Sequence, residues 1–402
     1  MKKLINQKIL LLAIVVLFWF AQYVYVPFQN SYLTVSNVSA NMIGTIIGAY
    51  GIAQCLLRLP VGIIADSIGK HRIFILVGAI FAGLASCIRV IMPNGEGFLI
   101  ANILSGIASS MWISYMVHYT GYFSKEQQQK ATSSIILVNN LGMLFGFVVS
   151  TLFYDKLGMK FLCIMSALAG IAGTILALNI KEHKNEKITQ NISFTQYISI
   201  CKNKRLIFFS ILALIQQGIQ MSTTMSFTTQ ILKDLGATSL IVGLSSILYM
   251  VFAVLSAGFA SSKFCTKHEP KLWISGVFSL ISIYCIIVPT VKSIPIIFLC
   301  QILPGISTGI LLSYLTSEAM KEVPKSKKST AMGFFQGVYA IGMSIFPMIV
   351  GTIATYNSLK TGYFVLAIVA ISGAVASIIY YNNYNKSIIK PSCPKETIKL
   401  LR

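Results

Sequence analysis

Acidic residues are scarce in this sequence, with only eleven Asp and Glu among 402 residues, and charged residues of both signs together make up only 11% of the chain. A soluble globular domain usually carries about 25% charged residues. Apolar residues instead make up 55% of the chain, and the mean hydropathy is +0.75. The shortage of charge excludes an ordinary soluble domain and indicates a chain that lies in a membrane.

The sequence also lacks the short motifs of common enzyme classes. It contains no zinc-binding H-E-x-x-H and no Walker A phosphate loop. The stretch GISTG from Gly305 to Gly309 matches the G-x-S-x-G nucleophile pattern, but it lies inside an apolar run, whereas that motif needs a strand-to-helix turn and a nearby base. The eight cysteines show no metal-type spacing and are expected to be small apolar core residues. We therefore expect no enzyme activity, no cofactor and no metal site.

Long apolar runs are abundant, and each can cross a bilayer, which takes about 20 residues. The twelve runs span residues 8–28, 41–64, 73–92, 97–121, 131–154, 159–180, 206–232, 240–262, 271–291, 294–318, 329–355 and 360–381. The first run is too long for a cleavable signal and has no small-residue cleavage site, so we expect it to be retained. Lipid offers the backbone no hydrogen-bond partners. The prediction is an all-α membrane protein with twelve transmembrane helices.

The net charge of +21 follows this topology. If both termini are cytoplasmic and the helices alternate, 25 of the 32 Lys and Arg fall in cytoplasmic segments. This asymmetry is the positive-inside rule. It predicts a multi-pass protein of the cell (inner) membrane with both termini in the cytoplasm, and it explains the basic charge without a nucleic-acid partner.

The two halves of the chain resemble each other. The polar segment 181–205 separates six runs from six, and at an offset of 199 residues Gly106 falls on Gly305 and Tyr115 falls on Tyr314. We predict an N-terminal half at 1–180, a cytoplasmic central loop at 181–205, a C-terminal half at 206–383 and a cytoplasmic tail at 384–402. Such repeats imply a binding site between two halves that rock to give alternating access.

Side-chain amides occur in the interiors of runs 1, 2, 4, 5, 7, 10 and 11 but not in runs 3, 6, 9 and 12. Every third helix is therefore suited to lipid contact, while the others are suited to line a polar cavity. In run 7, Gln216, Gln220 and Thr224 recur at i, i+4 and i+8, which predicts a polar stripe on one helix face.

The candidate solute-binding residues combine such amides with aromatic side chains, which suits a neutral or amphipathic organic solute. They are Gln22, Tyr25, Trp112, Tyr115, Gln216, Gln220, Thr224, Tyr314, Gln336 and Tyr339. Hydrogen bonding between neighbouring helices is the alternative role for the amides.

The segment between the second and third runs carries a family signature. Its pattern, Arg58-x-Pro60-x-Gly62-x-x-x-Asp66-x-x-Gly69-Lys70-x-Arg72, resembles the loop motif of the major facilitator superfamily, and the twelve runs in two repeated halves fit as well. The resemblance implies the fold of that superfamily and a secondary active transporter. It also implies a gate, for which the matching residues are Arg58, Gly62, Asp66, Gly69 and Arg72.

In that family the matching Asp docks against the cytoplasmic start of the eleventh helix, here 327–333. The free N–H groups and positive dipole end of a helix start suit a carboxylate such as Asp66. Gly62 and Gly69 allow a tight turn and a close approach. Snorkelling to lipid headgroups is the default expectation for Arg58 and Arg89, with a gate contact as the alternative for Arg58. A solvated basic hairpin is the alternative for the loop, but it leaves Asp66 unexplained.

Three functions stay open: efflux of an amphipathic compound, which the aromatic and carboxylate-poor candidates slightly favour, uptake of a nutrient or metabolite, and a sensor that does not transport. Mid-span carboxylates are missing, so the candidates for proton coupling are Glu318 and His118, at the cytoplasmic ends of runs 10 and 4. Glu318 either titrates when partly desolvated, forms a gate salt bridge or is solvated. The expected partners are a small-molecule solute, the lipid bilayer and, as candidate coupling ion, protons; we expect a monomer.

Overall fold

The computed structural model describes residues 2–38, 40–182 and 194–389, and these residues form helices and connecting turns without any strand. The N-terminal half contains α1 (Lys2–Tyr23), α2 (Val26–Val35), α3 (Ala40–Ile68), α4 (Arg72–Ile91), α5 (Gly95–Ser110), α6 (Trp112–Thr120) and α7 (Gln128–Ala177). The C-terminal half contains α9 (Lys204–Ser222), α10 (Thr228–Asp234), α11 (Ser239–Ala260), α12 (Lys263–Lys267), α13 (Pro270–Ile287), α14 (Ile294–Cys300), α15 (Ile302–Met320), α16 (Lys328–Tyr356) and α17 (Leu359–Ile389).

Eleven segments of the described residues are long and apolar enough to cross a membrane. One of them, Lys125–Ala177, is 53 residues long and includes α7. Within α7, Gly158 has a φ of 73°, a left-handed conformation that glycine adopts without steric cost. This residue divides α7 at the boundary between the fifth and sixth predicted runs. The eleven segments therefore contain all twelve runs, and the prediction of an all-α membrane protein is confirmed.

Four of the predicted spans are broken, and they are the first, fourth, seventh and tenth. α1 and α2 are separated at residues 24–25, α5 and α6 at Met111, and α14 and α15 at Gln301. In the seventh span a π-helical segment, Thr223–Phe227, separates α9 from α10. The breaks recur at every third span, as expected if each half is built from three-helix units.

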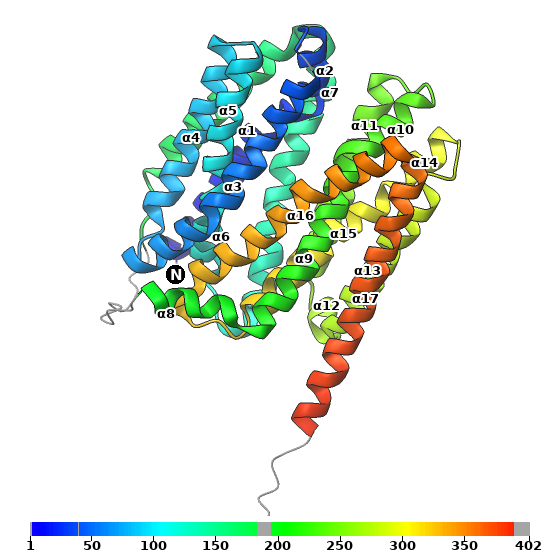
Figure 1. Cartoon of the computed structure of the whole chain (residues 1–402). Coiled ribbons are helices and arrows are strands. Elements are labelled where there is room, and N and C mark those ends of the chain that lie inside the picture. The colour runs from blue at the N-terminus through cyan, green and yellow to red at the C-terminus, as the bar shows by residue number, and fades with distance from the viewer. Residues whose placement is uncertain (1, 39, 183–193, 390–402) are drawn as a thin grey trace, which may run out of the picture.

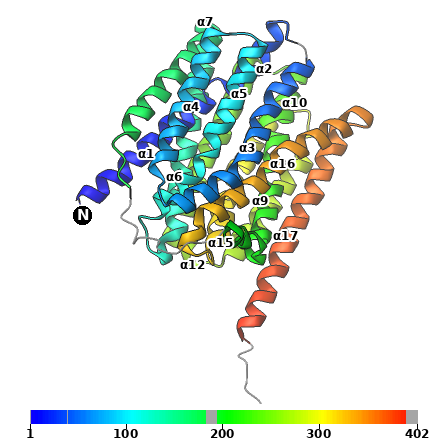
Figure 2. The same ribbon diagram turned by 60° about the vertical axis from the view of Figure 1, so that its left-hand side comes forward.

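Figures 1 and 2 show the two halves side by side, with α16 of the C-terminal half lying along α3 and α11 lying along α7. We call the end of the bundle at the bottom of Figure 1 the basic end, defined by Lys70, Lys125 and Lys325 in the turns before α4, α7 and α16. Large apolar side chains are left exposed on many of the helices, such as Leu168 on α7 and Ile368 on α17, as expected for a surface that faces lipid.

Two of the predicted segments outside the spans are partly helical. Part of the predicted central loop is helical, because α8 (Phe194–Ile198) and a 3₁₀ turn at Ser199–Lys202 lie at the basic end, where they contact α3 and α16. α17 continues to Ile389, beyond the predicted start of the tail at 384. The remainder of the predicted loop and tail, 183–193 and 390–402, lies outside the described residues.

Candidate functional site

Each half contains one of two repeat-related hydroxyl pairs. Tyr50 of α3 is hydrogen bonded to Ser109 of α5 at 2.9 Å, and Tyr249 of α11 is hydrogen bonded to Thr308 of α15 at 2.8 Å. The Tyr23 hydroxyl of α1 lies close to both Tyr50 and Tyr249. Polar groups of both halves thus lie near Tyr23 of the broken first span, and transporter binding sites typically lie at such an interface between repeats.

None of these five residues was among the sequence candidates, although a signal for them was present. The repeat offset of 199 residues places Tyr50 on Tyr249 and Ser109 on Thr308. Other tyrosines were predicted instead, because a tyrosine in an apolar run gives no local sign of whether its hydroxyl faces the other half or packs inside its own.

The predicted glutamines of the seventh span do join this group. Gln216 Nε2 donates to Gln220 Oε1 at 3.1 Å, and Gln220 Nε2 donates to the Tyr249 hydroxyl at 2.6 Å. Thr224 does not continue the stripe, because the π-helical segment begins one residue earlier and changes the helical period. Its side chain lies beside Tyr284 of α13, inside the C-terminal half.

Gln22 and Tyr25, the residues predicted in the first span, contact other residues of the N-terminal half. Gln22 Nε2 donates to the Ser105 carbonyl at 3.1 Å, and the Tyr25 ring lies 3.9 Å from the guanidinium carbon of Arg89. Arg89 is only 1% exposed and donates to Asn102 Oδ1 at 2.8 Å and to Ser105 Oγ at 2.9 Å. The expectation that Arg89 snorkels to headgroups is therefore wrong, because its neighbours on α5 hold it in the interior.

Three predicted aromatic residues pack inside their own halves. The Tyr115 hydroxyl donates to the Ile75 carbonyl at 2.8 Å, and its repeat partner Tyr314 donates to the Cys265 carbonyl at 2.8 Å. Trp112 packs edge-on against Trp19 at 5.2 Å. Each of the three side chains is at most 5% exposed. The structure does not bring them to the hydroxyl pairs.

Gln336 and Tyr339, the residues predicted in the eleventh span, contact Arg58 of the N-terminal half. Arg58 of α3 donates through Nη1 to the Gln336 carbonyl of α16 at 3.0 Å and through Nη2 to Gln54 Oε1. Its guanidinium carbon lies 4.8 Å from the centre of the Tyr339 ring. Arg58 is 2% exposed, so the default expectation of snorkelling is wrong, and the alternative of a contact between the halves describes its position.

Asp66 lies at the start of the eleventh span, as the family resemblance implies. Its Oδ1 accepts from the Ser329 backbone N–H at 2.9 Å, and its Oδ2 accepts from the Thr330 N–H at 2.6 Å and the Thr330 hydroxyl at 2.7 Å. These amides are among the first N–H groups of α16, which have no partner within the helix. The carboxylate therefore ties α3 to α16 at the basic end.

The glycines of the motif make this contact possible. A Cβ on Gly62 would overlap the backbone carbonyl of Ser329, and one on Gly333 would lie 2.5 Å from the Arg58 carbonyl. Gly69 has a φ of 65° and turns the chain after α3. Arg72 does not reach the other half, because it donates to the Leu178 carbonyl at 2.8 Å within the N-terminal half.

The two candidates for proton coupling each have partners within one half. Glu318 of α15 is 5% exposed, forms an ion pair with Arg205 of α9 and accepts from the Tyr381 hydroxyl at 2.9 Å. Of the three interpretations left open for Glu318, a solvated carboxylate is therefore excluded. The ion pair does not join the halves, so it is not a salt bridge across the gate.

His118 is 1% exposed at the end of α6, and its Nε2 is 3.1 Å from the Tyr122 hydroxyl. Its Nδ1 is 3.8 Å from Glu182 Oε1. Burial, with a smaller effect of the Glu182 charge, raises the pKa of Tyr122 to about 12, so this phenol stays neutral at physiological pH. Glu182 also accepts from the backbone N–H groups of His71 and Arg72 and thereby caps α4.

Comparison with known proteins agrees with this architecture. The family model described as Major Facilitator Superfamily matches residues 11–347 and 211–392. An uncharacterized MFS-type transporter of Methanocaldococcus jannaschii is 26% identical over 366 residues, which cover 88% of this chain and 92% of that protein. The inner membrane transport protein YajR of Escherichia coli is 24% identical over 153 residues, which cover 38% of this chain and 33% of YajR.

Solved structures of similar fold include the human organic anion transporter MFSD10 (TETRAN), with a TM-score of 0.75 and 12% identity over 92% of this chain and 98% of that one. A variant of the Escherichia coli fucose:proton symporter FucP gives a TM-score of 0.73 and 13% identity over 94% of this chain and 98% of that one. At these identities the likeness shows a shared fold. The fold and the family match define a polytopic transporter of alternating-access type, and the chain belongs to the major facilitator superfamily.

Proposed function

We propose that this chain is a secondary active transporter that binds a small organic solute between its halves and releases it on the opposite side of the membrane. The observation that carries the proposal is that Tyr23 lies close to a tyrosine of each repeat-related pair, Tyr50 with Ser109 in one half and Tyr249 with Thr308 in the other. A solute held by both pairs contacts both halves, so its binding energy depends on how the halves are arranged. Gln216 and Gln220 extend the proposed site in the C-terminal half.

The chemistry of the proposed site favours an amphipathic solute that is neutral or anionic. Its side chains are phenols, hydroxyls and amides, and the spans that carry them have no Asp or Glu in mid-span. The buried guanidinium groups of Arg58 and Arg89 lie near this region and disfavour a cation. We propose efflux of such a compound. Uptake of a nutrient or metabolite through the same site and a sensor without transport are the alternatives.

The gate of the proposed transporter is the contact of α3 with α16. Asp66, Arg58 and Gly62 meet α16 directly, while Gly69 and Arg72 shape the loop that follows α3. We place the basic end, and both termini, in the cytoplasm of a cell (inner) membrane, because Lys and Arg gather there. The described conformation, tied together at the basic end, is then the one closed towards the cytoplasm.

Protons remain one candidate for the coupling ion, with Glu318 or His118 as the titrating group. Glu318 carries this role only if its ion pair with Arg205 breaks during the cycle. Transport into sealed vesicles, measured before and after the proton gradient is collapsed, tests the coupling directly.

The site is tested by a thermal-shift screen of the purified protein in detergent against drugs, sugars, amino acids and other metabolites. A ligand that binds only the folded protein raises the melting temperature by mass action. We expect the shift to disappear in Gln220→Ala and Tyr249→Phe but to persist in Tyr115→Phe, whose hydroxyl bonds inside the N-terminal half. A shift that survives both site variants rejects the site. A hit that binds but is not moved in sealed vesicles identifies a sensor.

A further inference from the structure

Arg89 of α4 is a buried cation whose N–H groups are only partly paired. The residue is 1% exposed and lies in the last turn of α4, at the end opposite the basic end. Its Nη2 donates to Asn102 Oδ1 at 2.8 Å and to Ser105 Oγ at 2.9 Å, while Nε and Nη1 find no acceptor among the described residues. None of the ion pairs between described residues includes Arg89. Its positive charge is therefore buried without a negative partner.

The surroundings of the guanidinium do not compensate for this charge. Burial of a charge is unfavourable unless an opposite charge and hydrogen bonds offset the loss of water. The rings of Tyr25 and Phe98 lie with their centres 3.9 and 5.9 Å from the guanidinium carbon, and they attract the cation without neutralising it. Ionisable residues inside membrane spans generally serve binding or transport. An unpaired guanidinium of this kind suits an anion that comes from outside the protein.

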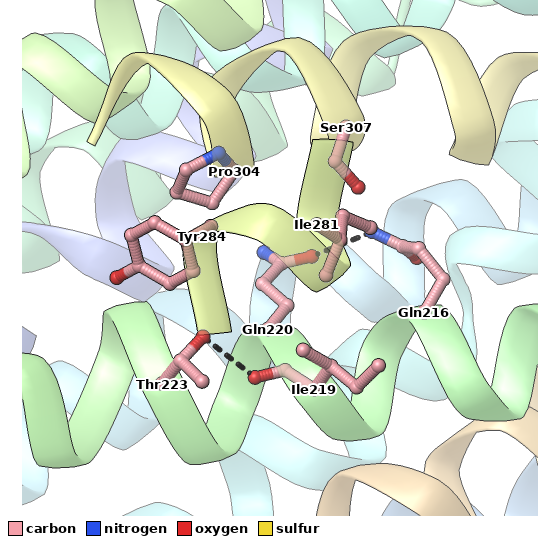
Figure 3. A pocket seen from close by; sticks show the side chains of 8 residues that line it. All are labelled: Gln216, Ile219, Gln220, Thr223, Ile281, Tyr284, Pro304 and Ser307. Carbon is pink, nitrogen blue, oxygen red and sulfur yellow. Dashed lines mark hydrogen bonds between the residues drawn. The ribbon is translucent and has the colours of Figure 1, made fainter. Parts of the chain in front are cut away.

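The C-terminal half has no basic residue at the corresponding position. At the repeat offset of 199 residues, Val288 corresponds to Arg89 and Pro304 corresponds to Ser105. Figure 3 shows Pro304 and Tyr284 at a small pocket whose lining residues are all uncharged. The same repeat is thus packed in the C-terminal half without a guanidinium. Packing alone does not account for Arg89, so its charge has another use.

Arg89 also lies close to the proposed solute site. Ser105 and Ser109 are four residues apart on α5, so they share one helix face, about one turn apart. Ser105 is bonded to Arg89, and Ser109 is bonded to Tyr50. Tyr25, whose ring covers the guanidinium, belongs to the break between α1 and α2. A side chain at such a break can move aside without the unwinding of a helix.

We propose that Arg89 binds the anionic group of the solute, a carboxylate, sulfonate or phosphate, while Tyr50 and Ser109 contact its uncharged remainder. The inference rests on the proposed function and narrows its solute to an organic anion. A guanidinium donates several hydrogen bonds to such groups at a fixed geometry. Because α3 and α16 are tied together at the basic end, a solute enters this conformation from the opposite end, where Arg89 lies.

The test is the melting temperature of the purified protein in detergent with pairs of ligands that differ in charge, all at equal ionic strength. The pairs are benzoate and benzamide, indole-3-acetate and indole-3-acetamide, and benzenesulfonate and benzenesulfonamide. We expect the anion of at least one pair to give a saturable rise that its amide does not give. Arg89→Gln should weaken the apparent affinity for that anion by about tenfold or more. The control Lys160→Gln, which removes an exposed positive charge on α7, should leave it unchanged.

Asn102→Asp tests the same site in a protein that keeps its guanidinium. Asn102 Oδ1 already accepts from Arg89, so this nearly isosteric change supplies the arginine with a carboxylate from within the protein. We expect the rise caused by the anion to disappear while the protein still folds. This variant gives an answer even where Arg89→Gln does not fold.

Equal melting curves for the two members of every pair overturn the proposal. A rise caused by the anion that stays the same in Arg89→Gln or Asn102→Asp overturns the placement of the site. A rise produced by short-chain phosphatidylglycerol and by none of the soluble anions makes a lipid headgroup the occupant and overturns the assignment to a solute. The proposed function is judged separately, because a neutral compound that is moved in sealed vesicles and needs Tyr249 leaves that function standing and overturns only the preference for an anion.

Discussion

Replacement of Asp66 by asparagine is the most direct test of the contact that closes the basic end. The carboxylate accepts three hydrogen bonds from Ser329 and Thr330 and places a negative charge at the start of α16. The amide side chain would keep the shape of the carboxylate but replace one of its oxygens by an NH₂ group, which cannot accept. The substitution therefore removes acceptors from a buried contact without creating a cavity.

The size of the effect follows from these contacts. A buried N–H left without its acceptor costs about 1–3 kcal/mol. Loss of a negative charge at a helix N-terminus costs about 0.3–1 kcal/mol more. A total of about 3 kcal/mol corresponds to a shift of about a hundredfold towards the conformation in which α3 and α16 separate. Thr330→Val, which removes one of the three donors, should give a shift of about tenfold or less.

The assay is the distance between spin labels at two exposed positions of the basic end, Gln127 on the N-terminal half and Lys325 on the C-terminal half, in a background without native cysteines. We expect Asp66→Asn to add a population with a longer distance and to impair transport while membrane insertion stays normal. Asp155→Asn, an exposed change at the other end, is the control. Unchanged distances together with full transport in Asp66→Asn would refute the gate.

Three further predictions concern contacts at or near the basic end. Gly62→Ala should destabilise the closed basic end by about 1–3 kcal/mol, because its Cβ meets the Ser329 carbonyl, whereas Gly48→Ala points into open space and should have no effect; the same label distances measure both. Glu318→Gln should lower stability by about 3–5 kcal/mol in thermal unfolding, because Arg205 is left buried without its carboxylate, and an unchanged melting temperature would exclude a buried pair. Arg58→Lys keeps the charge but loses the fork that holds two acceptors, so transport should fall while expression is retained; full transport would count against its place in the gate.

The contact of Asp66 with the start of α16 was predictable from the sequence because a short local pattern carries it. The spacing of Gly62, Asp66 and Gly69 follows from one turn and one helix contact, and the family resemblance supplied the partner helix. The solute site was only partly predictable. Gln216 and Gln220 were found from helical periodicity, but Thr224 was misplaced, because a π turn inserted into the span changes the period.

The two buried arginines show the same limit of prediction from local sequence. Arg58 and Arg89 lie near the ends of apolar runs, where the local rule predicts snorkelling, yet both are buried because distant residues offer them acceptors. Glu318 was open to three interpretations for the same reason. Its partner Arg205 lies 113 positions away in the chain, and only packing of α9 against α15 brings the two together.

The sequence by itself determined that the chain lies in a membrane, how many times it crosses the membrane and that its two halves are repeats. Burial of apolar surface in lipid and pairing of backbone groups act on each apolar run separately, so they follow from local composition. Only the tertiary structure decided which polar side chains meet. Tyr50 pairs with Ser109 because α3 packs on α5, and Tyr249 pairs with Thr308 because α11 packs on α15, and no local rule specifies which residues meet there. The membrane location and the transmembrane segments follow from local composition, whereas a binding site depends on how helices from distant parts of the chain pack together.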